Sequence, residues 1–358
     1  MIRNFDVKNN FAEIFDPNTG FYVRSGVYHN GVDTGVDPFM RSFPSLIDIG
    51  VMGRCKHGLS GKCLSSGVEC YQDGYNVANA NMTLDNFKKI IDESKGKVFQ
   101  VALGGRGDVD QHENFEELLN YCRDNNIVPN FTSSGLGFTK EIAKICSKYV
   151  GAVAISYYRQ QHTFTAMMRL LDAGVKTNIH YVLGNNSIDE AMELMEKGIF
   201  DENINAIIFL LHKPVGLGTE KNVLSVDDPK VKKFFNYIDN ADLPWKIGFD
   251  SCTVPGLINY TKNIHPYSLD TCEGARWSMY ISSDMKALPC SFDNDQMRWV
   301  VDLNNKTILE AWQSDQFENF RDHFRNACPS CKNQRDCFGG CPITKSITLC
   351  NKKERTSY

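Results

Sequence analysis

Cysteine is the residue type whose number and spacing in this sequence could do chemistry. The 358 residues include 13 cysteines, and eight of these fall between Cys252 and Cys350. An odd number of thiols cannot all pair as disulfides, and nothing in the sequence indicates an oxidising compartment. Thiols that cluster in a reducing compartment usually bind a metal ion or an iron–sulfur cluster. The sequence therefore predicts cysteine-ligated metal centres in a cytoplasmic protein.

A first group of three cysteines follows an expected strand. Cys55, Cys63 and Cys70 have the spacing CX7CX6C within a glycine-rich stretch, which is flexible enough to fold around a bulky cluster. Three thiolates without a fourth nearby suggest a [4Fe–4S] cluster with one open iron. An open position is what a catalytic metal centre keeps for its substrate or cofactor. The alternative is a zinc site with His57 as the fourth ligand.

A second group lies near the carboxyl terminus. Four of its cysteines have the spacing CX2CX5CX3C, with two more upstream and one downstream. Zinc is an alternative because CX2C pairs suit tetrahedral zinc, but a zinc ribbon normally brings two such pairs and this chain has one. The seven cysteines are Cys272, Cys290, Cys328, Cys331, Cys337, Cys341 and Cys350.

Short β-rich runs alternate with helix-period segments from residue 46 to about residue 250. Such repetition predicts a parallel sheet with crossover helices. Six or seven units favour a full or partial β/α barrel, with its chemistry at the carboxyl ends of the strands. We therefore expect an α/β fold with a partial (β/α)6 TIM-like barrel. The expected strands are 46–49, 98–103, 127–132, 152–155, 178–183, 206–211 and 246–249.

Two signals mark helix starts within this region. Residues 187–190 match a capping box, and Asp228–Pro229 matches an N-cap with proline at the first helical position. After residue 250, helical signal shrinks to the stretch from Ile308 to Phe324. Cys122 and Cys146 lie on apolar helix faces and are expected in the core.

Three regions follow from these patterns. Residues 1–44 are rich in aromatic side chains and are expected to cap the barrel or to bind a partner, and residues 45–250 form the barrel. Residues 251–358 are dominated by loops and carry too little regular core to stand alone, so ligated metal must organise them. We expect a loop-rich domain organised by iron–sulfur clusters.

Composition excludes several classes of protein. The net charge of −4 argues against a general nucleic-acid or anionic-membrane surface. The longest apolar runs, such as residues 207–211, are far short of the ~18 residues that a membrane span needs. The first ten residues contain no apolar segment of the kind that a secretory signal has. We expect neither a nucleic-acid nor a membrane partner.

The cysteine loop after the first strand, ending in Cys70-Tyr71-Gln72, resembles the cluster motif of radical S-adenosylmethionine (SAM) enzymes. The spacing in that family is usually CxxxCxxC, so the loop of this chain is longer. The resemblance implies that Cys55, Cys63 and Cys70 bind the cluster at which SAM binds, with Tyr71 beside the cofactor.

Further turns resemble the SAM-binding turns of this family. The turn Gly104-Gly105-Arg106 stands where the family has GGEP, which implies contact with the SAM amino group. Arg106 replaces the acidic residue, so Asp108 or Asp110 is the substitute. Ser133 and Ser134 stand where the family has a small polar turn, and Ser156 with Arg159 where a serine and an arginine commonly hold the SAM carboxylate. The alternative for Arg159 is a solvent-facing salt bridge. The SAM-contact residues implied in this way are Tyr71, Gly104, Gly105, Arg106, Asp108, Ser133, Ser134, Ser156 and Arg159.

The carboxyl-terminal cysteines resemble the SPASM domain, an extension of many radical SAM peptide-modifying enzymes that holds two auxiliary [4Fe–4S] clusters. The resemblance implies that Cys328, Cys331, Cys337 and Cys350 bind the distal cluster. It also implies that Cys272, Cys290 and Cys341 bind the nearer one. We expect Cys252 as the fourth ligand of the nearer cluster; the alternative is a free thiol at the barrel mouth beside an open cluster.

Together the two resemblances imply three [4Fe–4S] clusters and SAM as cofactors. The reduced barrel cluster would pass an electron to SAM, and the resulting 5′-deoxyadenosyl radical would abstract a hydrogen from the substrate. The chain also looks like peptide maturases that act on Cys-xxx repeats. The expected substrate is therefore a ribosomally made, cysteine-containing precursor peptide, and the expected reductant is a flavodoxin or ferredoxin.

Thioether formation in such a peptide is the main functional hypothesis. Asp250 and Asp293 lie close to auxiliary-cluster cysteines and are candidate proton acceptors, although aspartates in such loops more often cap turns. One alternative is dehydrogenation of a peptidyl cysteine or serine to formylglycine, as in sulfatase-maturing relatives. From another class, the chain could be a non-catalytic iron–sulfur electron carrier or a zinc-stabilised binding protein.

Overall fold

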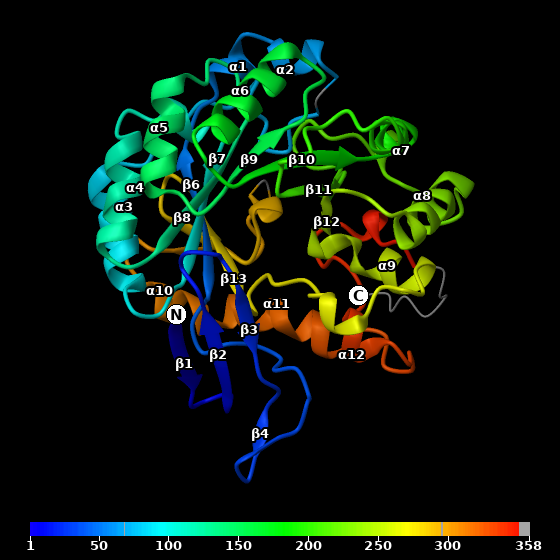
Figure 1. Ribbon diagram of the computed structural model, residues 1–358. Helices are drawn as coiled ribbons and strands as arrows, with labels where there is room; N and C mark the ends of the chain where they lie inside the picture. The colour runs from blue at the N-terminus through cyan, green and yellow to red at the C-terminus, as the bar shows by residue number, and fades with distance from the viewer. Residues whose placement is uncertain (68, 295, 351–358) are drawn as a thin grey trace.

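The computed structural model describes residues 1–67, 69–294 and 296–350. Within these residues one ten-stranded sheet has the order β12-β11-β10-β9-β8-β7-β6-β13-β14-β15 (Figure 1). The strands from β6 to β12 pair in parallel, each with its neighbour in sequence. They are β6 (Leu46–Met52), β7 (Gln100–Gly105), β8 (Val128–Ser133), β9 (Val153–Ser156), β10 (Thr177–Leu183), β11 (Ala206–Leu211) and β12 (Lys246–Phe249).

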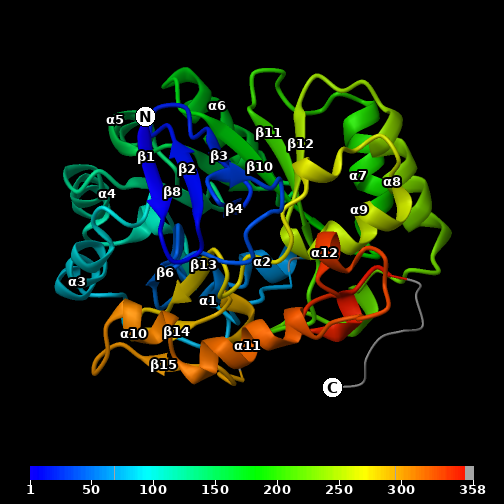
Figure 2. The same ribbon diagram turned by 90° about the horizontal axis from the view of Figure 1, so that it is seen from below.

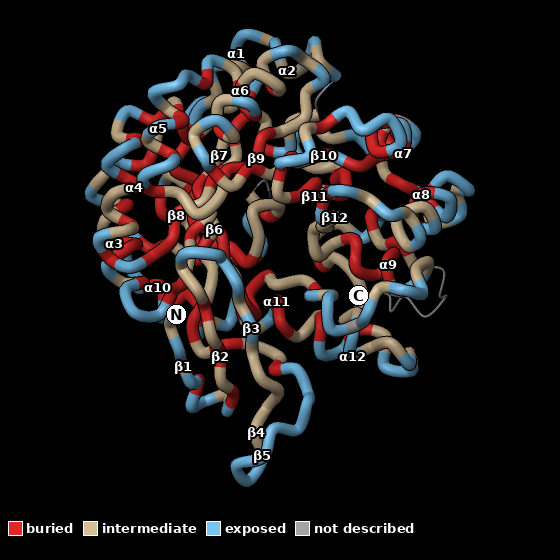
Figure 3. Tube along the Cα trace, in the orientation of Figure 1, coloured by how far each residue is buried: buried red, intermediate tan, exposed pale blue. Residues whose placement is uncertain are grey.

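A helix crosses over between each strand and the next, and it buries one apolar face against the sheet. Figure 1 shows these helices on the outer side of the curved sheet, and Figure 3 shows buried residues along the central strands. Six strand–helix units followed by β12 make a partial barrel, so the predicted fold class is confirmed. The six helices are α3 (Leu84–Ser94), α4 (Phe115–Asp124), α5 (Lys140–Tyr149), α6 (Gln161–Asp172), α7 (Ile188–Glu196) and α8 (Pro229–Asn240).

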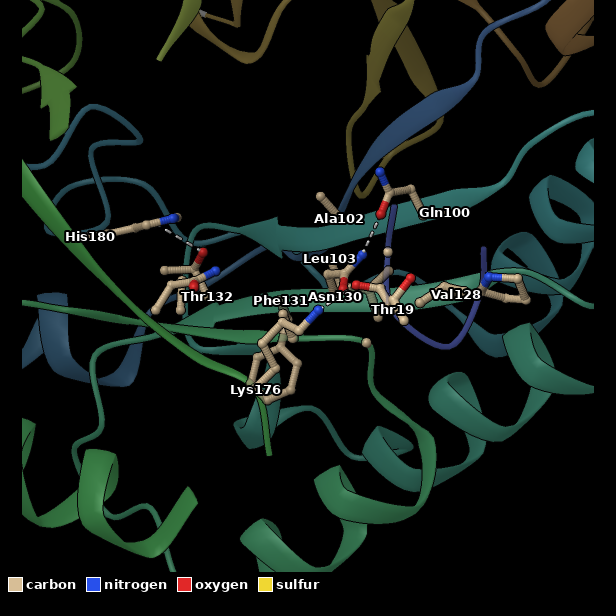
Figure 4. A pocket seen from close by; sticks show the side chains of 16 residues that line it. Thr19, Gln100, Ala102, Leu103, Val128, Asn130, Phe131, Thr132, Lys176 and His180 are labelled. Atoms are coloured by element: carbon tan, nitrogen blue, oxygen red, sulfur yellow. Dashed lines mark hydrogen bonds between the residues drawn. The ribbon is translucent and has the colours of Figure 1, made fainter. Parts of the chain in front are cut away.

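The inner face of the barrel is polar. Gln100, Asn130 and His180 line a cavity of about 330 Å³ between β7 and β10 (Figure 4). Asn130 Nδ2 donates to Gln100 Oε1 at 3.1 Å, and His180 Nδ1 lies 3.4 Å from the Thr132 hydroxyl. Burial lowers the pKa of His180 to about 4, against the weaker opposing effect of Asp250. At neutral pH this part of the cavity wall therefore offers uncharged hydrogen-bonding groups.

The amino-terminal segment covers the amino ends of the barrel strands. In Figure 2, β1–β3 lie in front of the barrel, and Phe15 of this sheet stacks on Phe99 with ring centroids 5.2 Å apart. The turn after β2 brings Thr19 to the wall of the cavity, where its carbonyl accepts a hydrogen bond from Lys176. The strands are β1 (Ile2–Asp6), β2 (Phe11–Phe15), β3 (Tyr22–Arg24), β4 (Tyr28–His29) and β5 (Val32–Asp33).

A buried ion pair fixes this segment to the barrel. The Arg41 guanidinium lies 2.7 Å from Glu13 Oε1, and the two side chains are 4% and 0% exposed. Arg41 also donates to the carbonyls of Phe43, Pro44 and Lys97, so most of its hydrogen-bonding capacity is used.

The central sheet continues into the carboxyl-terminal region. Strand β13 (Ser278–Ile281) pairs in parallel with β6, and β14 (Lys286–Leu288) and β15 (Val301–Asp302) follow antiparallel. The sequence patterns missed these short strands. The domain boundaries at residues 44/45 and 250/251 stay predictions, and residues 351–358 of the last region lie outside the described residues.

Two local predictions were wrong in detail. The helix expected from Ile308 to Phe324 is divided in two, because Ser314 caps a second helix by accepting from Phe317 N at 3.3 Å. Ser187 does precede α7, but it makes no capping hydrogen bond; its hydroxyl binds Val182 O and Gly184 N instead. The cap predicted at Asp228 is present, with Lys230 N donating to Asp228 Oδ1 at 2.9 Å.

The remaining helices are short. In the residues with described structure, none of the helices is both long and apolar enough to cross a membrane. The α-helices are α1 (Lys56–Leu59), α2 (Lys62–Ser65), α9 (Val254–Tyr260), α10 (Ile308–Trp312), α11 (Asp315–Arg325) and α12 (Gln334–Cys337). The 3₁₀ helices are η1 (Val109–Gln111), η2 (Glu220–Asn222), η3 (Ser251–Thr253), η4 (Pro266–Ser268), η5 (Ser291–Asp293) and η6 (Lys345–Ile347).

The ion pair between Arg41 and Glu13 gives a stability prediction. Glu13→Ala should lower the free energy of unfolding by about 3–5 kcal/mol, because it leaves a buried guanidinium without its counter-charge. Glu193→Ala is the matched control, since it removes an exposed pair with Lys197 and should cost less than about 0.5 kcal/mol. Urea denaturation followed by circular dichroism measures both, and equal effects would contradict the prediction.

The buried imidazole of His180 predicts a pH dependence. Its pKa falls from 6.5 to about 4 on folding, so between these values the unfolded chain binds a proton that the folded chain does not. The contribution of His180 to stability is therefore present above pH 6.5 and is lost as pH falls, by up to about 3 kcal/mol at pH 4. His180→Gln should abolish this component. The measurement is the difference in unfolding free energy between wild type and His180→Gln at pH 7 and at pH 4.5. The same difference at both pH values would refute the prediction.

Candidate functional site

The loop after β6 carries the first three cysteines at the carboxyl end of the strand. Cys55 caps α1, and its sulfur accepts a hydrogen bond from Gly58 N at 3.1 Å. Cys63 lies in α2, and Cys70 lies where the loop turns back toward the barrel. Burial, together with the neighbouring Cys55 and Cys70 thiols, raises the pKa of Cys63 to about 12. The structure therefore brings the three predicted ligands near one another on one partly buried loop.

The glycine turn after β7 packs directly on this loop. Gly105 has φ +110°, and a Cβ there would come within 2.4 Å of Met52 O. Arg106 N donates to the same Met52 carbonyl at 2.8 Å, and its Nε donates to Gln72 O at 2.8 Å. Glycine is thus required by the close approach of two strand ends, whereas Arg106 holds the far end of the cysteine loop. A Cβ on Gly104 would meet no atom within 4 Å, so this residue borders open space.

Asp108 joins the loops that follow three neighbouring strands. Its carboxylate accepts from Ser134 N at 2.7 Å and from the Ser134 hydroxyl at 2.5 Å. His57 Nε2, from the cysteine loop, lies 3.2 Å from Asp108 Oδ2. Ser133 faces inward on its own turn and accepts from Gly135 N at 3.0 Å. Burial and then the charge of Asp108 raise the pKa of the nearby Asp110 to about 6.

The loop after β11 holds the cysteine loop from the other side. Glu69 accepts from Thr219 N at 2.7 Å and from Asn222 Nδ2 at 2.6 Å. Leu217 N donates to Cys70 O at 3.0 Å, and a Cβ on Gly216 would lie 2.5 Å from Tyr71 O. The ends of β6, β7, β8 and β11 therefore fix one loop.

Ser156 is the last residue of β9 and Arg159 lies just beyond it, at the strand end as predicted, but the arginine has a partner. Arg159 Nε donates to both carboxylate oxygens of Glu190 at 2.8 Å, and its guanidinium lies 5.8 Å from the Tyr181 ring centroid. Ser156 supplies a backbone carbonyl that lies 3.5 Å from the Thr163 hydroxyl. Contact between Arg159 and the SAM carboxylate stays a prediction, and it would require this arginine to leave Glu190.

Buried polar atoms without a hydrogen-bond partner surround the cysteine loop. Within the described ranges they are Gln72 Nε2, Asp110 Oδ1 and His162 Nε2, while the nearby His57 Nε2 has the Asp108 carboxylate 3.2 Å away. Burial and then the nearby His57 lower the pKa of His162, while Asp108 opposes this shift. An unpartnered buried polar group costs about 1–3 kcal/mol, so a cluster of three indicates space for a polar ligand. With three soft thiolates beside it, this space fits an iron–sulfur cluster and a polar cofactor.

Cys252 follows β12 and meets cysteines from far along the chain. Its thiol is hydrogen-bonded to Cys341, and this bond, followed by burial, raises the pKa of Cys252. Cys272 and Cys290 also lie near this group, since burial and the neighbouring Cys252 thiol raise the pKa of each. Burial raises the pKa of Cys272 to about 12. The four thiols predicted for the nearer auxiliary cluster are therefore neighbours.

A buried lysine stands beside this group, and the sequence patterns missed it. The Lys213 side chain is 4% exposed, and its Nζ donates to Asp250 Oδ2 at 2.6 Å and to Leu211 O at 2.8 Å. Burial alone would lower its pKa, but Asp250 and the Cys252 thiol hold the pKa of Lys213 above its usual range. A lysine directly after an apolar strand was the available signal.

The two predicted proton acceptors are both engaged. Asp250 accepts from Lys213, from Leu211 N at 3.0 Å and from the Thr253 hydroxyl at 2.7 Å. Asp293 is 1% exposed and accepts from Trp299 N at 3.2 Å, with Arg298 3.5 Å away. Their catalytic roles stay predictions, while their observed contacts are those of structural carboxylates.

The four cysteines predicted for the distal cluster line one small cavity of about 50 Å³ beside α9; they are Cys328, Cys331, Cys337 and Cys350. Burial raises the pKa of Cys337 to about 11. In the part of the chain that is described, no three potential ligands converge on a single metal ion. A four-iron cluster is larger than one ion and holds its thiolates farther apart. Cys122 and Cys146, by contrast, are fully buried in α4 and α5, as expected for core residues.

Tyr71 lies at the junction of the two cysteine regions. Its ring centroid is 4.8 Å from that of Phe292, which follows Cys290 by two residues, and Lys213 Nζ lies 4.5 Å from the Phe292 ring centroid. The predicted cofactor contact of Tyr71 stays a prediction. Its position shows that the barrel loop and the carboxyl-terminal cysteines border the same part of the molecule.

Comparisons with known proteins agree with this arrangement. Residues 272–338 match the family described as an iron–sulfur cluster-binding domain, SPASM. Streptococcus suis SuiB bound to S-adenosylmethionine is 17% identical, with a TM-score of 0.66 over 89% of this chain and 78% of that chain. SuiB bound to its precursor peptide SuiA has the same identity and TM-score over 89% and 77%.

A second solved protein has a similar structure. Histidine-tagged anSMEcpe with bound AdoMet is 15% identical, with a TM-score of 0.60 over 87% of this chain and 89% of that chain. No curated protein sequence matches the chain. At these identities the likeness shows a shared fold. The chain thus shares the fold of these SAM-bound structures, and its residues 272–338 match the SPASM iron–sulfur cluster-binding domain, so the SPASM resemblance of the carboxyl-terminal cysteines is confirmed.

Proposed function

We propose that this chain is a radical SAM peptide maturase. It cleaves SAM reductively, abstracts a hydrogen from a ribosomally made precursor peptide and forms thioether crosslinks from cysteine. The observation that carries the proposal is the three-cysteine loop held at the carboxyl ends of β6, β7, β8 and β11. In a β/α barrel these strand ends are where chemistry takes place.

Cys55, Cys63 and Cys70 are the proposed ligands of the barrel cluster. SAM bound there would supply, on reductive cleavage, the hydrogen-atom abstraction, so the cofactor carries the radical chemistry and the protein provides binding and orientation. The chain supplies the polar surroundings: Asp108 presents a carboxylate beside His57, and His162 presents a ring nitrogen that has no hydrogen-bond partner among the described residues. The open space beside Gly104 leaves the backbone of the glycine turn accessible to a ligand. Ser133, Ser134, Ser156 and Arg159 complete the proposed SAM surroundings.

The carboxyl-terminal cysteines are proposed to hold two auxiliary clusters. Cys252, Cys272, Cys290 and Cys341 are neighbours at the barrel mouth. Cys328, Cys331, Cys337 and Cys350 line the separate cavity beside α9. The positive charge of Lys213 beside Cys252 and Cys341 favours ionised thiols, which are the form that binds iron.

A cysteine-containing peptide is the proposed substrate. The solved structures that share this fold include SuiB with precursor peptide SuiA and anSMEcpe with Cp18Cys peptide, at TM-scores of 0.66 and 0.58. The cavity of about 330 Å³ offers uncharged amide, hydroxyl and imidazole groups, which suit peptide groups. Forming a thioether removes one hydrogen from carbon and one from sulfur, so the product is two hydrogens lighter than the substrate.

Dehydrogenation of a peptidyl cysteine or serine is the second candidate. It is supported by the likeness to anSMEcpe, whose solved complex contains the peptide Cp18Cys. Its product from serine is also two hydrogens lighter, and so is the thioaldehyde that cysteine gives before water replaces the sulfur, so at that stage the mass alone does not separate the two reactions. Fragmentation does: a thioether links two positions of the peptide, whereas dehydrogenation alters one residue.

The cluster assignment predicts a metal content. After anaerobic reconstitution we expect about 12 iron and about 12 sulfide per chain, since three four-iron clusters are proposed. The double variant Cys328→Ser, Cys331→Ser should bind about 8 iron, because it removes two ligands of one cluster. Cys122→Ala is the control and should retain about 12, because Cys122 is a core residue outside the clusters. Zinc in place of iron would contradict the proposal.

The activity predicts two products from one incubation. Reduced holoenzyme with SAM should release 5′-deoxyadenosine, and a synthetic peptide of repeated Cys-Ala-Gly-Asn units should become two hydrogens lighter per crosslink. Cys55→Ala should reduce both below about 1% of wild type, because the cluster loses one of three ligands. Mass spectrometry measures both. Release of 5′-deoxyadenosine with an unmodified peptide would exclude thioether formation, and no release at all would exclude the radical SAM assignment.

A further inference from the structure

A carboxyl group that no motif indicated lies on the inner face of the barrel. Asp48 is the third residue of β6, between Ile47 and Ile49, which are fully buried on the outer face. In the sheet register, Asp48 pairs with Ala102 on one side and with Tyr280 on the other. Directly paired residues point to the same face of a sheet. Ala102 lines the barrel cavity (Figure 4), so the strand register places Asp48 on the inner face of the sheet as well.

The Asp48 carboxyl has no partner. Among the described residues, no hydrogen bond or ion pair engages its side-chain oxygens, unlike those of Asp250 and Asp293. The titratable groups that face it are Glu273, from the segment before β13, and the hydroxyls of Tyr71 and Tyr280. Burial, and then the charge of Glu273, raise the pKa of Asp48 to about 7.

A second unpartnered group lies in the same corner. Gln72 is 3% exposed, and its Nε2 donor has no hydrogen-bond partner in the described chain, while its Oε1 accepts from Asn294 at 3.2 Å. Gln72 lies beside the hydroxyls of Tyr71 and Tyr280, the same two groups that face Asp48. The corner thus holds one carboxyl that can accept a proton and one amide that can donate a hydrogen bond.

We propose that this corner receives the cysteine side chain of the substrate peptide, with Asp48 as the acceptor of its thiol proton and Gln72 as the hydrogen-bond donor to the resulting thiolate. The proposal rests on the proposed function and names a catalytic residue for it. In this step the S–H bond breaks and an O–H bond forms on Asp48. The sulfur keeps the electron pair, and nothing is oxidised or reduced.

The pKa of the Asp48 carboxyl is close to that of the cysteine thiol whose proton it is proposed to accept. A cysteine thiol has an ordinary pKa of about 8.5, so transfer of its proton to a carboxyl that titrates near 7 is only slightly uphill. Proton acceptors whose pKa lies near the working pH are the effective ones. An amide donor aimed at the thiolate offsets part of the remaining cost, because hydrogen bonds to charged groups are strong.

The test compares three carboxyl variants of the reconstituted holoenzyme on the Cys-Ala-Gly-Asn repeat peptide. Asp48→Asn should lower kcat for crosslinking about 100-fold, with KM changed less than about threefold. Iron content and peptide-free release of 5′-deoxyadenosine should stay at wild-type levels. Asp48→Glu should restore part of the rate. Asp172→Asn is the matched control, since it makes the same change at the end of α6, away from the barrel interior, and it should crosslink normally.

The pH profile separates a proton acceptor from a structural residue. Wild-type crosslinking should rise as pH increases through about 7, because Asp48 must be ionised to accept a proton. In Asp48→Asn the rise in crosslinking rate should instead occur near the pKa of the substrate thiol, about 8.5. Gln72→Met provides a second test in case Asp48→Asn binds less iron. The pH dependence of crosslinking by Gln72→Met should also shift to higher pH, because the thiolate loses its hydrogen-bond donor.

Two failures are distinguishable. Crosslinking by Asp48→Asn at the wild-type rate with an unchanged pH profile would overturn the role of Asp48 and leave the proposed function standing. Wild-type enzyme that leaves the peptide unmodified would instead overturn thioether formation, and the proposal for Asp48 would fall with it.

Discussion

The close approach of two strand ends is the constraint on which the rest of the site depends. At Met52 and Gly105 the backbones of β6 and β7 come so near that no side chain fits between them. The turn that follows can therefore lie directly on the cysteine loop, where Arg106 fastens Gln72 and where Asp108 reaches both His57 and Ser134. A long loop that would otherwise be free is held from several sides. Its three thiols can then face one space rather than solvent.

Buried cations balance the cysteine-rich region. Lys213 stands beside Cys252 and Cys341, and Arg276 is 1% exposed beside Cys272, with a pKa lowered by burial to about 10. Arg276 also donates to Cys272 O at 3.0 Å and lies 4.3 Å from the Phe338 ring centroid. Burying a charge is costly unless it is paired. Lys213 is paired with Asp250, whereas the hydrogen bonds of Arg276 go to uncharged oxygens, so ionised sulfurs in this group would supply the counter-charge of Arg276.

The sequence predicted the barrel well because its strands are apolar runs separated by amphipathic helices. All seven expected strands are present, most of them shifted by one to three residues at an end. The cysteine groups were also foreseeable, since no other residues could ligate clusters. Strands β13–β15 were missed because they are two to four residues long and lie among cysteines and turns. The break between α10 and α11 at Ser314 was missed because the helical spacing of apolar residues continues across it.

The side chains that line the inside of the barrel were harder to predict from the sequence. His180 and Asp48 alternate with apolar residues on their strands, and such alternation in a strand covered by helices does indicate a polar interior. The signal is weak because a half-buried strand at a sheet edge has the same pattern. Arg159 shows a different limit: its motif position is as expected, but its contact with Glu190 depends on α7, about thirty residues away. No local pattern contains that information.

The pairing of β13 with β6 has a consequence for electron transfer. Cys272 and Cys290 flank β13, and the loop of Cys55, Cys63 and Cys70 follows β6, so backbone hydrogen bonds between two strands connect the two cysteine regions. Sliding one strand by a single residue would change their separation by about 3.3 Å and would turn every side chain to the opposite face. Electron tunnelling weakens steeply with distance. With the proposed clusters in place, the register of this strand pair would set the distance between the barrel cluster and the carboxyl-terminal clusters, and therefore the rate of electron transfer between them.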